Sequence, residues 1–254
     1  MKVTFLGTGT SQGVPVIACD CAVCISANQY DKRLRVSVLV EMQGKTIIID
    51  TGPDFRYQML QAGVKKLDAI LYTHEHKDHV AGLDDVRAFN YVQGSAVDIY
   101  AHKRVQEALK KEFHYVFSGS NYPGIPRLKL NTIQDGLPFQ AAGIDVIPIS
   151  VMHFQLPVLG FRMGDFTYIT DANLITEAEK LKIKGSDILV INALQKEKHV
   201  SHFTLEEALE LAAEIGAKKT YLTHISHRLG THDEVSEQLP EGVFLAYDGL
   251  ELEL

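Results

Sequence analysis

Short apolar runs alternate with turns and helical stretches along the 254-residue chain. The runs are rich in valine and isoleucine, or they alternate apolar and polar positions with the two-residue period of a half-buried strand. We therefore predict strands at Lys2–Leu6, Val36–Glu41, Thr46–Asp50, Ala69–Tyr72, Asp98–Ala101, Ile144–Ile149, Gly160–Met163, Phe166–Ile169, Ile188–Ile191, Thr220–Leu222 and Gly242–Leu245, and a last one at Leu250–Leu254.

Helix signals lie between these strands. Pro53 and Gly63 bound one predicted helix, with proline in the first turn and glycine at the C-terminal end. Lys103–Glu112 is an amphipathic candidate, and Thr231–Gln238 makes a short last helix. Two capping boxes are predicted, at Thr176-Glu177-Ala178-Glu179 and at Thr204-Leu205-Glu206-Glu207.

The helix after Thr204 should end at Gly216 and bury one apolar face, formed by Leu205, Ala208, Leu209, Ala212 and Ile215. The longest irregular stretch is Phe113–Arg127, which is either a lid or a surface loop.

Length and composition fit one α/β domain over residues 1–254, because 46% of the residues are hydrophobic. The formal net charge of −7 argues against a nucleic-acid surface, which usually appears as a basic domain or stripe. No apolar run approaches the roughly 20 residues that span a bilayer. The N-terminal MKVTFLGTGT lacks the apolar core of a signal peptide, so we expect a cytoplasmic protein.

Four potential metal ligands crowd into the stretch YTHEHKDHV: His74, His76, Asp78 and His79. They follow a buried strand, and loops at strand ends are where rigid scaffolds present chemistry. In an extended segment His74 and His76 point to the same side, whereas the adjacent Asp78 and His79 diverge. Imidazole and carboxylate suit Zn²⁺, Mn²⁺ or Fe²⁺. The pattern predicts a site for more than one metal ion; a polar, solvated turn is the alternative.

All three cysteines, Cys19, Cys21 and Cys24, lie within six residues. An odd, clustered set is a poor disulfide framework and a good start to a metal site. Three thiolates lack one ligand for a closed tetrahedral zinc site, and His227 is a natural fourth. The alternatives are three free thiols, or one disulfide with one thiol left over.

The pattern H-x-H-x-D-H after an apolar strand, with T-I-I-I-D-T-G upstream, resembles the metallo-β-lactamase superfamily over nearly the whole chain. The resemblance implies a four-layer αββα sandwich, in which two mixed sheets pack face to face and the metal ions lie at one edge. It implies that His74, His76 and His153 hold one metal ion, that Asp78, His79 and His224 hold the other, and that Asp171 bridges the two. Asp50 is expected to orient a ligand histidine; capping the helix at Pro53 is its alternative role.

Two features point to the phosphodiesterase branch. His202 resembles a histidine of tRNA 3′ endonucleases and PhnP-like enzymes, which would protonate the leaving group or steady the phosphoryl group. His199 is a rival for this role, and a structural histidine beside a helix N-cap is the alternative. The set Cys19, Cys21, Cys24 and His227 resembles the PhnP-like enzymes, where it would form a structural zinc site. The loop Gly7–Ser11 either offers N–H groups to a phosphate or makes a tight turn.

The resemblance therefore implies a phosphodiesterase with two divalent ions (Zn or Mn) and one structural Zn. A metal-bridging hydroxide would attack a small phosphodiester, a cyclic phosphate of a sugar or nucleotide, with Asp78 and His202 in catalytic roles. The alternatives are a tRNA 3′-end endonuclease, a carbon-centred hydrolase such as a lactamase or a glyoxalase II-like thioesterase, and a non-enzymatic binding module. The endonucleases carry a basic arm, whereas Lys103–Lys111 has the pattern of an amphipathic helix. We expect a small-molecule substrate rather than nucleic acid, no membrane partner, and a homodimer by resemblance.

Overall fold

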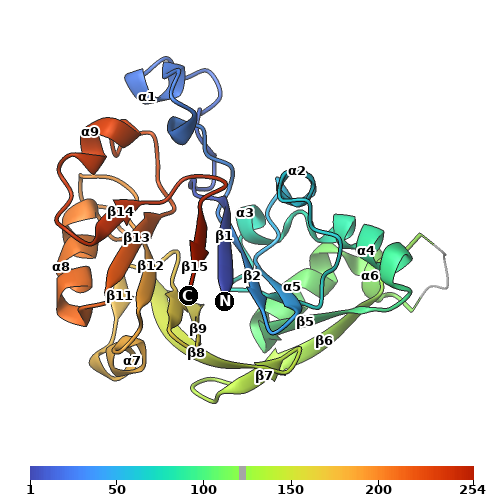
Figure 1. The fold of residues 1–254 in the computed structure, drawn as a ribbon. Helices are drawn as coiled ribbons and strands as arrows, with labels where there is room; N and C mark the ends of the chain where they lie inside the picture. The colour runs from blue at the N-terminus through green and yellow to red at the C-terminus, as the bar shows by residue number, and fades with distance from the viewer. Residues whose placement is uncertain (120–123) are drawn as a thin grey trace.

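Two β-sheets pack face to face in the computed structural model, which describes residues 1–119 and 124–254 (Figure 1). The strands of the first sheet are β1 (Lys2–Gly7), β2 (Ser37–Met42), β3 (Lys45–Ile49), β4 (Ala69–Leu71), β5 (Val97–His102), β6 (Leu128–Ile133) and β15 (Glu251–Glu253). Their order is β15-β1-β2-β3-β4-β5-β6. The pairs from β15 to β3 are antiparallel and those from β3 to β6 are parallel, so the sheet is mixed.

The second sheet contains β8 (Ile144–His153), β9 (Leu156–Met163), β10 (Phe166–Tyr168), β11 (Leu174–Ile175), β12 (Ile188–Asn192), β13 (Lys219–Thr223) and β14 (Val243–Leu245). Their order is β11-β8-β9-β10-β12-β13-β14, and β7 (Phe139–Ala141) pairs with β8. This sheet is also mixed, because β10, β12, β13 and β14 run parallel while β8 and β9 form a hairpin.

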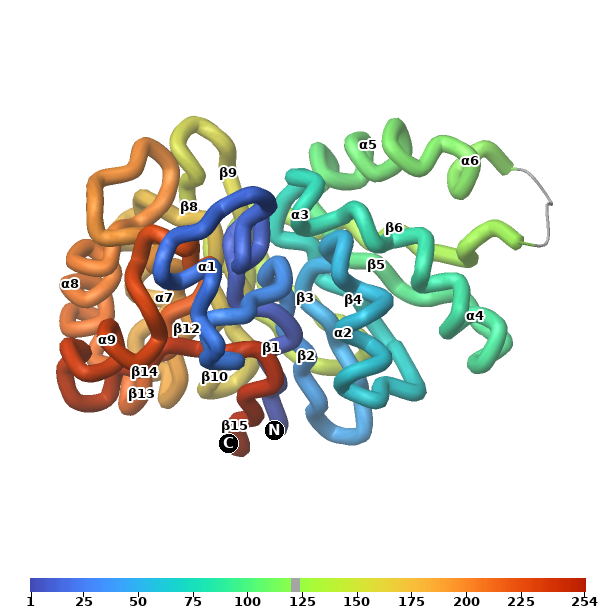
Figure 2. Tube along the Cα trace, turned by 90° about the horizontal axis from the view of Figure 1, so that it is seen from above, coloured from blue at the N-terminus to red at the C-terminus, as the bar shows by residue number. Residues whose placement is uncertain are grey.

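Helices cover the outer side of each sheet. The described helices are α1 (Ala22–Ile25), α2 (Phe55–Gln61), α3 (Lys77–Val80), α4 (Arg87–Gln93), α5 (Lys103–Glu112), α6 (His114–Phe117), α7 (Glu177–Ile183), α8 (Leu205–Ile215) and α9 (His232–Ser236), with the 3-10 helices η1 (Gln29–Asp31) and η2 (Leu83–Val86). Of these, α1 lies apart from the sheets, on the N-terminal loop (Figure 1). Seen from above, α2, α4 and α5 lie on one side of the molecule and α7, α8 and α9 on the other, with the sheets between them (Figure 2). Every helix described within residues 1–119 and 124–254 falls short of the length and apolarity that a bilayer crossing requires.

The alternation of side chains along each strand builds three apolar layers. In β3, Ile47 and Ile49 enter the core between the sheets, whereas Ile48 packs in the layer beneath the outer helices. In β12, Val190 points to the same central core and Leu189 to the layer under α8. Successive residues of a strand face opposite sides, so a strand buried on both faces is apolar throughout. The predicted four-layer αββα sandwich is confirmed.

All twelve predicted strands are present, with ends that shift by a few residues. The sequence pattern missed β6, β7 and β11. β6 lies at a sheet edge and is partly exposed along its length, so it carries no continuous apolar run. β7 and β11 are two or three residues long, too short to show a period.

Most predicted helices are also confirmed, but one capping box is not. Thr204 and Glu207 form the expected reciprocal bonds, and α9 carries a second such box. At α7 the predicted box is absent, because the Glu179 carboxylate instead accepts the backbone N–H of Ser150 on β8 and pairs with Lys182.

Two further helix predictions need correction. The buried face of α8 includes Leu211 in place of Leu209, which is only partly buried. The stretch Phe113–Arg127 contains α6, so it is not wholly irregular, and its residues 120–123 lie outside the part of the chain that the structure describes.

Candidate metal centre and active site

The predicted ligands come from strand ends that meet at one edge of the sandwich. His74 follows β4, His153 ends β8, and His224 follows β13 directly. The backbone N–H of Leu159 on β9 bonds to the carbonyl of Thr73, which ties the two sheets together beside the ligands. The structure thus brings side chains that are up to 150 positions apart in the sequence, His74 and His224, into one site.

Three residues of this edge adopt a left-handed backbone: Asp50 (φ 62°), Asp171 (φ 52°) and His224 (φ 55°). Such angles cost on the order of 1–3 kcal/mol for a residue other than glycine, and they concentrate at functional sites. Each of these residues comes one to three positions after a buried strand. The chain therefore accepts local strain where its side chains turn into the cluster.

Asp50 holds His79 in place. One Asp50 oxygen accepts the backbone N–H of Thr73 at 2.9 Å, and the other accepts the Thr73 hydroxyl and His79 Nδ1, both at 2.7 Å. This agrees with the expected orienting role. Asp50 makes no cap for α2, whose N-cap residue is Asp54.

The opposite nitrogen of His79 faces two carboxylates. Nε2 lies 3.2 Å from Oδ2 of Asp78 and 3.2 Å from Oδ2 of Asp171, and it is buried without a hydrogen-bond partner of good geometry. Burial opposes a charge on this ring, but Asp171, Asp78 and Asp50 raise the pKa of His79 well above its ordinary value. The site therefore attracts a positive charge to the space between Nε2 and the two carboxylates, and a metal ion can supply it.

Asp171 lies at the centre of the cluster. Its Oδ2 is 3.2 Å from His79 Nε2 and 3.2 Å from His224 Nδ1, while its Oδ1 is 3.1 Å from His202 Nε2. Burial would raise the pKa of this carboxyl, but His224 and His79 hold it well below the usual range. An ionised carboxylate with both oxygens directed at different partners has the geometry of a bridging ligand.

The remaining candidate histidines present free lone pairs. The ring centroids of His74, His76 and His153 lie 4.5 to 5.8 Å apart, and His74 Nε2 is buried with no partner. His153 directs Nδ1 at the carbonyl of Ser201 at 2.8 Å, which leaves Nε2 for another ligand. Burial lowers the pKa of His74 and His153, and lowers that of His224 to about 4. Neutral imidazole is the form that binds metal.

These distances fit a metal centre. Ligand atoms bound to one tetrahedral ion at roughly 2.0–2.1 Å lie about 3.3 Å apart, which is close to the 3.2 Å separations around His79 and Asp171. Ligand atoms of two sets, His74-His79-Asp171 and His153-Asp171-His202, also fall within 4.8 Å of one another. Asp171 belongs to both, so the residues fit a divalent metal cluster around it.

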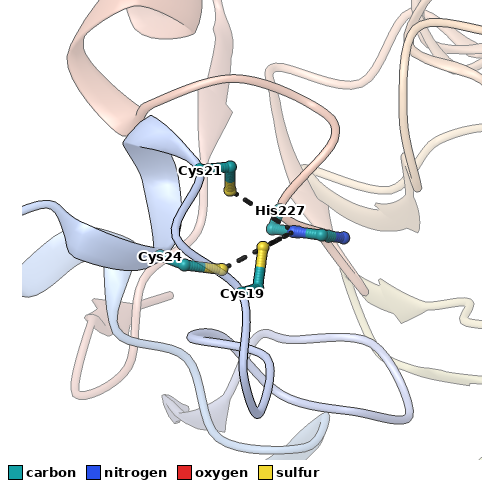
Figure 3. A group of neighbouring side chains, drawn as sticks. All are labelled: Cys19, Cys21, Cys24 and His227. Atoms are coloured by element: carbon teal, nitrogen blue, oxygen red, sulfur yellow. Dashed lines mark hydrogen bonds between the residues drawn. The ribbon is translucent and has the colours of Figure 1, made fainter.

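The cysteine cluster is assembled as well. Nδ1 of His227 lies 3.3, 3.4 and 3.5 Å from the Sγ atoms of Cys19, Cys21 and Cys24, and no disulfide joins these cysteines (Figure 3). A tetrahedral zinc ion with three thiolates and one imidazole would place these atoms about 3.6 Å apart. A backbone hydrogen bond from Cys24 lowers the pKa of Cys21 to about 6, whereas burial raises that of Cys24 to about 11.

His202, rather than His199, reaches the cluster. His202 is 8% exposed and its Nε2 contacts Asp171, whereas His199 contacts Ser201 and the far side of the His202 ring. The backbone directly after His202 is anchored, because Phe203 N–H bonds to the carbonyl of Ala172.

Sequence reasoning missed the contact of Thr10 with His224. The Thr10 hydroxyl lies 3.2 Å from His224 Nε2, so it can hold this ring with Nδ1 toward Asp171. The same loop does not offer a phosphate cradle at Gly9 and Thr10, because their N–H groups bond to the carbonyls of Leu34 and Ile225. In the sequence Thr10 is adjacent to no candidate ligand, so no local signal marked this contact.

A cavity of about 420 Å³ opens beside the cluster, lined by His76, His153, Phe154, Gln155, Leu156, Val200 and Ser201. A larger one of about 670 Å³ lies near the N-terminal loop, lined by residues such as Arg33, Gln58 and Asp248, and it contains none of the candidate ligands. Of these two cavities, the smaller one is therefore the one lined by candidate ligands.

Residues 45–225 match the family model of a beta-lactamase superfamily domain. The chain is 42% identical to a diphosphatase from the PhnP family whose crystal structure aligns with 100% of this chain and 97% of that one, at a TM-score of 0.93. It is 43% identical over 99% of its length to an octanoyltransferase of Porphyromonas gingivalis, but it spans only 51% of that relative. It is 24% identical to ribonuclease Z of Bacillus subtilis, over 99% of this chain and 98% of the relative.

The family match covers most of the chain and nearly all of the candidate active-site residues, from His74 to His224. The diphosphatase shares the fold over the full length. The chain therefore belongs to the metallo-β-lactamase superfamily and, within it, to the PhnP family, and it is a metal-dependent hydrolase.

Proposed function

We propose that the protein is a dinuclear-metal phosphodiesterase that hydrolyses small cyclic phosphates of a sugar or nucleotide. The observation that carries the proposal is the place of His202, whose Nε2 lies 3.1 Å from the central Asp171 carboxylate. A histidine at this point can give a proton to an oxygen that leaves phosphorus, and an alkoxide needs that proton. A thiolate is a far weaker base, so a thioesterase has less use for such a group.

The ligand roles are those that the resemblance implies, and the contacts of Asp171 with His79 and His224 support its part in them. His74, His76 and His153 would hold one ion, Asp78, His79 and His224 the other, and Asp171 would bridge them. Two such ions lower the pKa of a bound water and neutralise charge on the substrate oxygens. In the proposed reaction water adds to phosphorus, the bond to the ester oxygen breaks, and His202 delivers a proton to that oxygen.

The size and lining of the cavity favour a small substrate. Its volume of about 420 Å³ lies in the range of roughly 300–1,000 Å³ typical of small-molecule sites. Phe154 is 55% exposed at its rim and offers an apolar surface for a sugar or base.

We assign the cysteine cluster to a structural zinc ion. Three thiolates and His227 fill a tetrahedral shell with protein ligands, which leaves no position for substrate. The ion would clamp the N-terminal loop that carries Cys19–Cys24 to the segment after β13, which also carries His224.

Two relatives suggest other phosphorus substrates. The PhnP-family diphosphatase makes a diphosphate bond in a small molecule the second candidate. The ribonuclease Z relatives make RNA 3′ ends the third. A phosphate leaves more readily than an alkoxide, so loss of His202 should matter less for a diphosphate than for an alkyl ester.

The test combines a metal count with a substrate panel. The full chain should carry two exchangeable metal ions and one that survives mild chelation. It should hydrolyse aryl phosphodiesters and a 1,2- or 2′,3′-cyclic phosphate, with little action on β-lactams or thioesters. A diphosphate ester and a 3′-extended tRNA complete the panel.

Three results would reverse the proposal. Thioesterase activity with inert phosphodiesters assigns the carbon-centred alternative, and turnover confined to the diphosphate or to tRNA assigns the second or third candidate. As a control for metal dependence, Asp171→Asn should abolish turnover of every substrate, while Asp54→Asn, on α2, should not.

A further inference from the structure

We infer that His199 is a positioning residue: its Nδ1 accepts a hydrogen bond from Nδ1 of His202 and so directs Nε2 of His202 at Asp171 and the substrate. This inference rests on the proposed function, because it concerns the group that would protonate the leaving oxygen. Nothing in the resemblance or in the relatives assigns a role to His199.

The direction of the hydrogen bond follows from a neighbouring donor. The backbone N–H of Ser201 lies 3.4 Å from His199 Nδ1, and a backbone N–H can only donate. His199 Nδ1 therefore presents its lone pair at this point. In the 3.1 Å contact between the two rings, the hydrogen must then be on Nδ1 of His202.

This arrangement decides where the other proton of His202 is carried. With one hydrogen committed to His199, any proton available for transfer is on Nε2, the nitrogen 3.1 Å from Asp171. Without this acceptor the His202 ring could rotate or flip and turn Nε2 away from Asp171. His199 thus fixes the ring orientation of His202, as the buried aspartate does for the histidine of a Ser-His-Asp triad.

The surroundings of His199 favour the form in which its Nδ1 accepts a hydrogen bond. Burial, then the neighbouring His202 and Arg228, lower the pKa of His199 below its ordinary value, which favours the neutral ring that can accept a hydrogen bond. The Ser201 hydroxyl lies 3.1 Å from His202 Nδ1 and 3.4 Å from His199 Nδ1. It is the one rival acceptor that these contacts offer, and it provides a matched control.

The kinetic test uses two esters. Bis(4-nitrophenyl) phosphate, the aryl ester, has a good leaving group, and a dialkyl phosphodiester, the alkyl ester, has a poor one. His199→Ala should lower kcat for the alkyl ester about tenfold, and for the aryl ester by less than about twofold. His199→Asn should recover most of the loss, because its amide oxygen can take the place of Nδ1. In a His202→Ala background, His199→Ala should cost nothing more.

A second measurement tests the contact between His199 and His202 without measuring turnover. Imidazole ¹⁵N spectra of the metal-loaded protein should show Nδ1 of His202 protonated in the wild type, and a mixture of tautomers in His199→Ala. In Ser201→Ala the ¹⁵N spectrum should still show Nδ1 of His202 protonated.

The outcomes separate the two proposals. If the wild type turns over neither ester, the proposed function fails, and the ¹⁵N spectra still decide the role of His199. Four results would overturn the positioning role and leave the phosphodiesterase proposal standing. Two are kinetic: equal losses of kcat on both esters, or full additivity of His199→Ala with His202→Ala. The other two are an effect of Ser201→Ala larger than that of His199→Ala, and an unprotonated Nδ1 on His202.

Discussion

Replacing Asp50 with asparagine should weaken metal binding without changing any proposed ligand. Asp50 is fully buried, and its carboxylate accepts three hydrogen bonds, from Thr73 N–H, the Thr73 hydroxyl and His79 Nδ1. The asparagine oxygen can still accept Thr73 N–H at 2.9 Å. Its NH₂ group then occupies the second position, where it donates toward the nitrogen of His79.

That donor changes the tautomer of His79. Nδ1 must supply a lone pair, so the hydrogen moves to Nε2, the atom 3.2 Å from Asp78 and Asp171. A metal ion must displace this hydrogen or break the new bond. Loss of such an orienting partner typically costs 10–100-fold in metal affinity, equivalent to about 1.4–2.7 kcal/mol.

The assay is a Mn²⁺ titration of chelator-treated protein, followed by calorimetry and by recovery of phosphodiesterase activity. Asp50→Asn should need 10–100 times more metal for half-recovery and should approach the wild-type rate at saturation. Asp54→Asn is the control, because its carboxylate bonds to Arg35 outside the cluster. Unchanged affinity in Asp50→Asn, or equal losses in both variants, would refute the assigned orienting role.

Three further predictions concern stability. Cys21→Ser should remove one tightly held zinc and lower Tm before it affects turnover; an unchanged Tm and metal count would rule out the structural zinc. Thr204→Ala should destabilise the fold by about 1 kcal/mol in urea unfolding, because it removes the reciprocal cap of α8, and no change would mean that the cap is redundant. Burial raises the pKa of Asp248 from 3.8 to about 6, so the folded state keeps this proton to higher pH than the unfolded state. The stability of the wild type relative to Asp248→Asn should therefore fall by roughly 2.4 kcal/mol between pH 4 and 7, and parallel unfolding profiles would contradict this.

The strands were predictable because burial repeats along them at a fixed period. The run Ile188–Ile191 is apolar throughout since its residues alternate between two buried layers. The capping box predicted at Thr176 was wrong because its outcome depends on a distant contact. Glu179 accepts a hydrogen bond from Ser150 on β8, and no local pattern reveals a partner 29 residues away.

The residue types that can bind metal could also be recognised in the sequence, whereas the contacts between them could not. The stretch from His74 to His79 concentrates metal-binding groups, and the resemblance supplied His153, Asp171 and His224. Only the folded chain shows that Asp171 contacts His79, His202 and His224 together.

By itself the sequence determined the fold class, the loop that carries the metal ligands and the cysteine cluster, because these depend on side-chain type and local period. The tertiary structure decided which histidine faces the Asp171 carboxylate, that His199 contacts the far side of that histidine, and that Thr10 contacts His224. These choices depend on the positions of strand ends brought together from distant parts of the chain, and on hydrogen-bond geometry that no local pattern encodes.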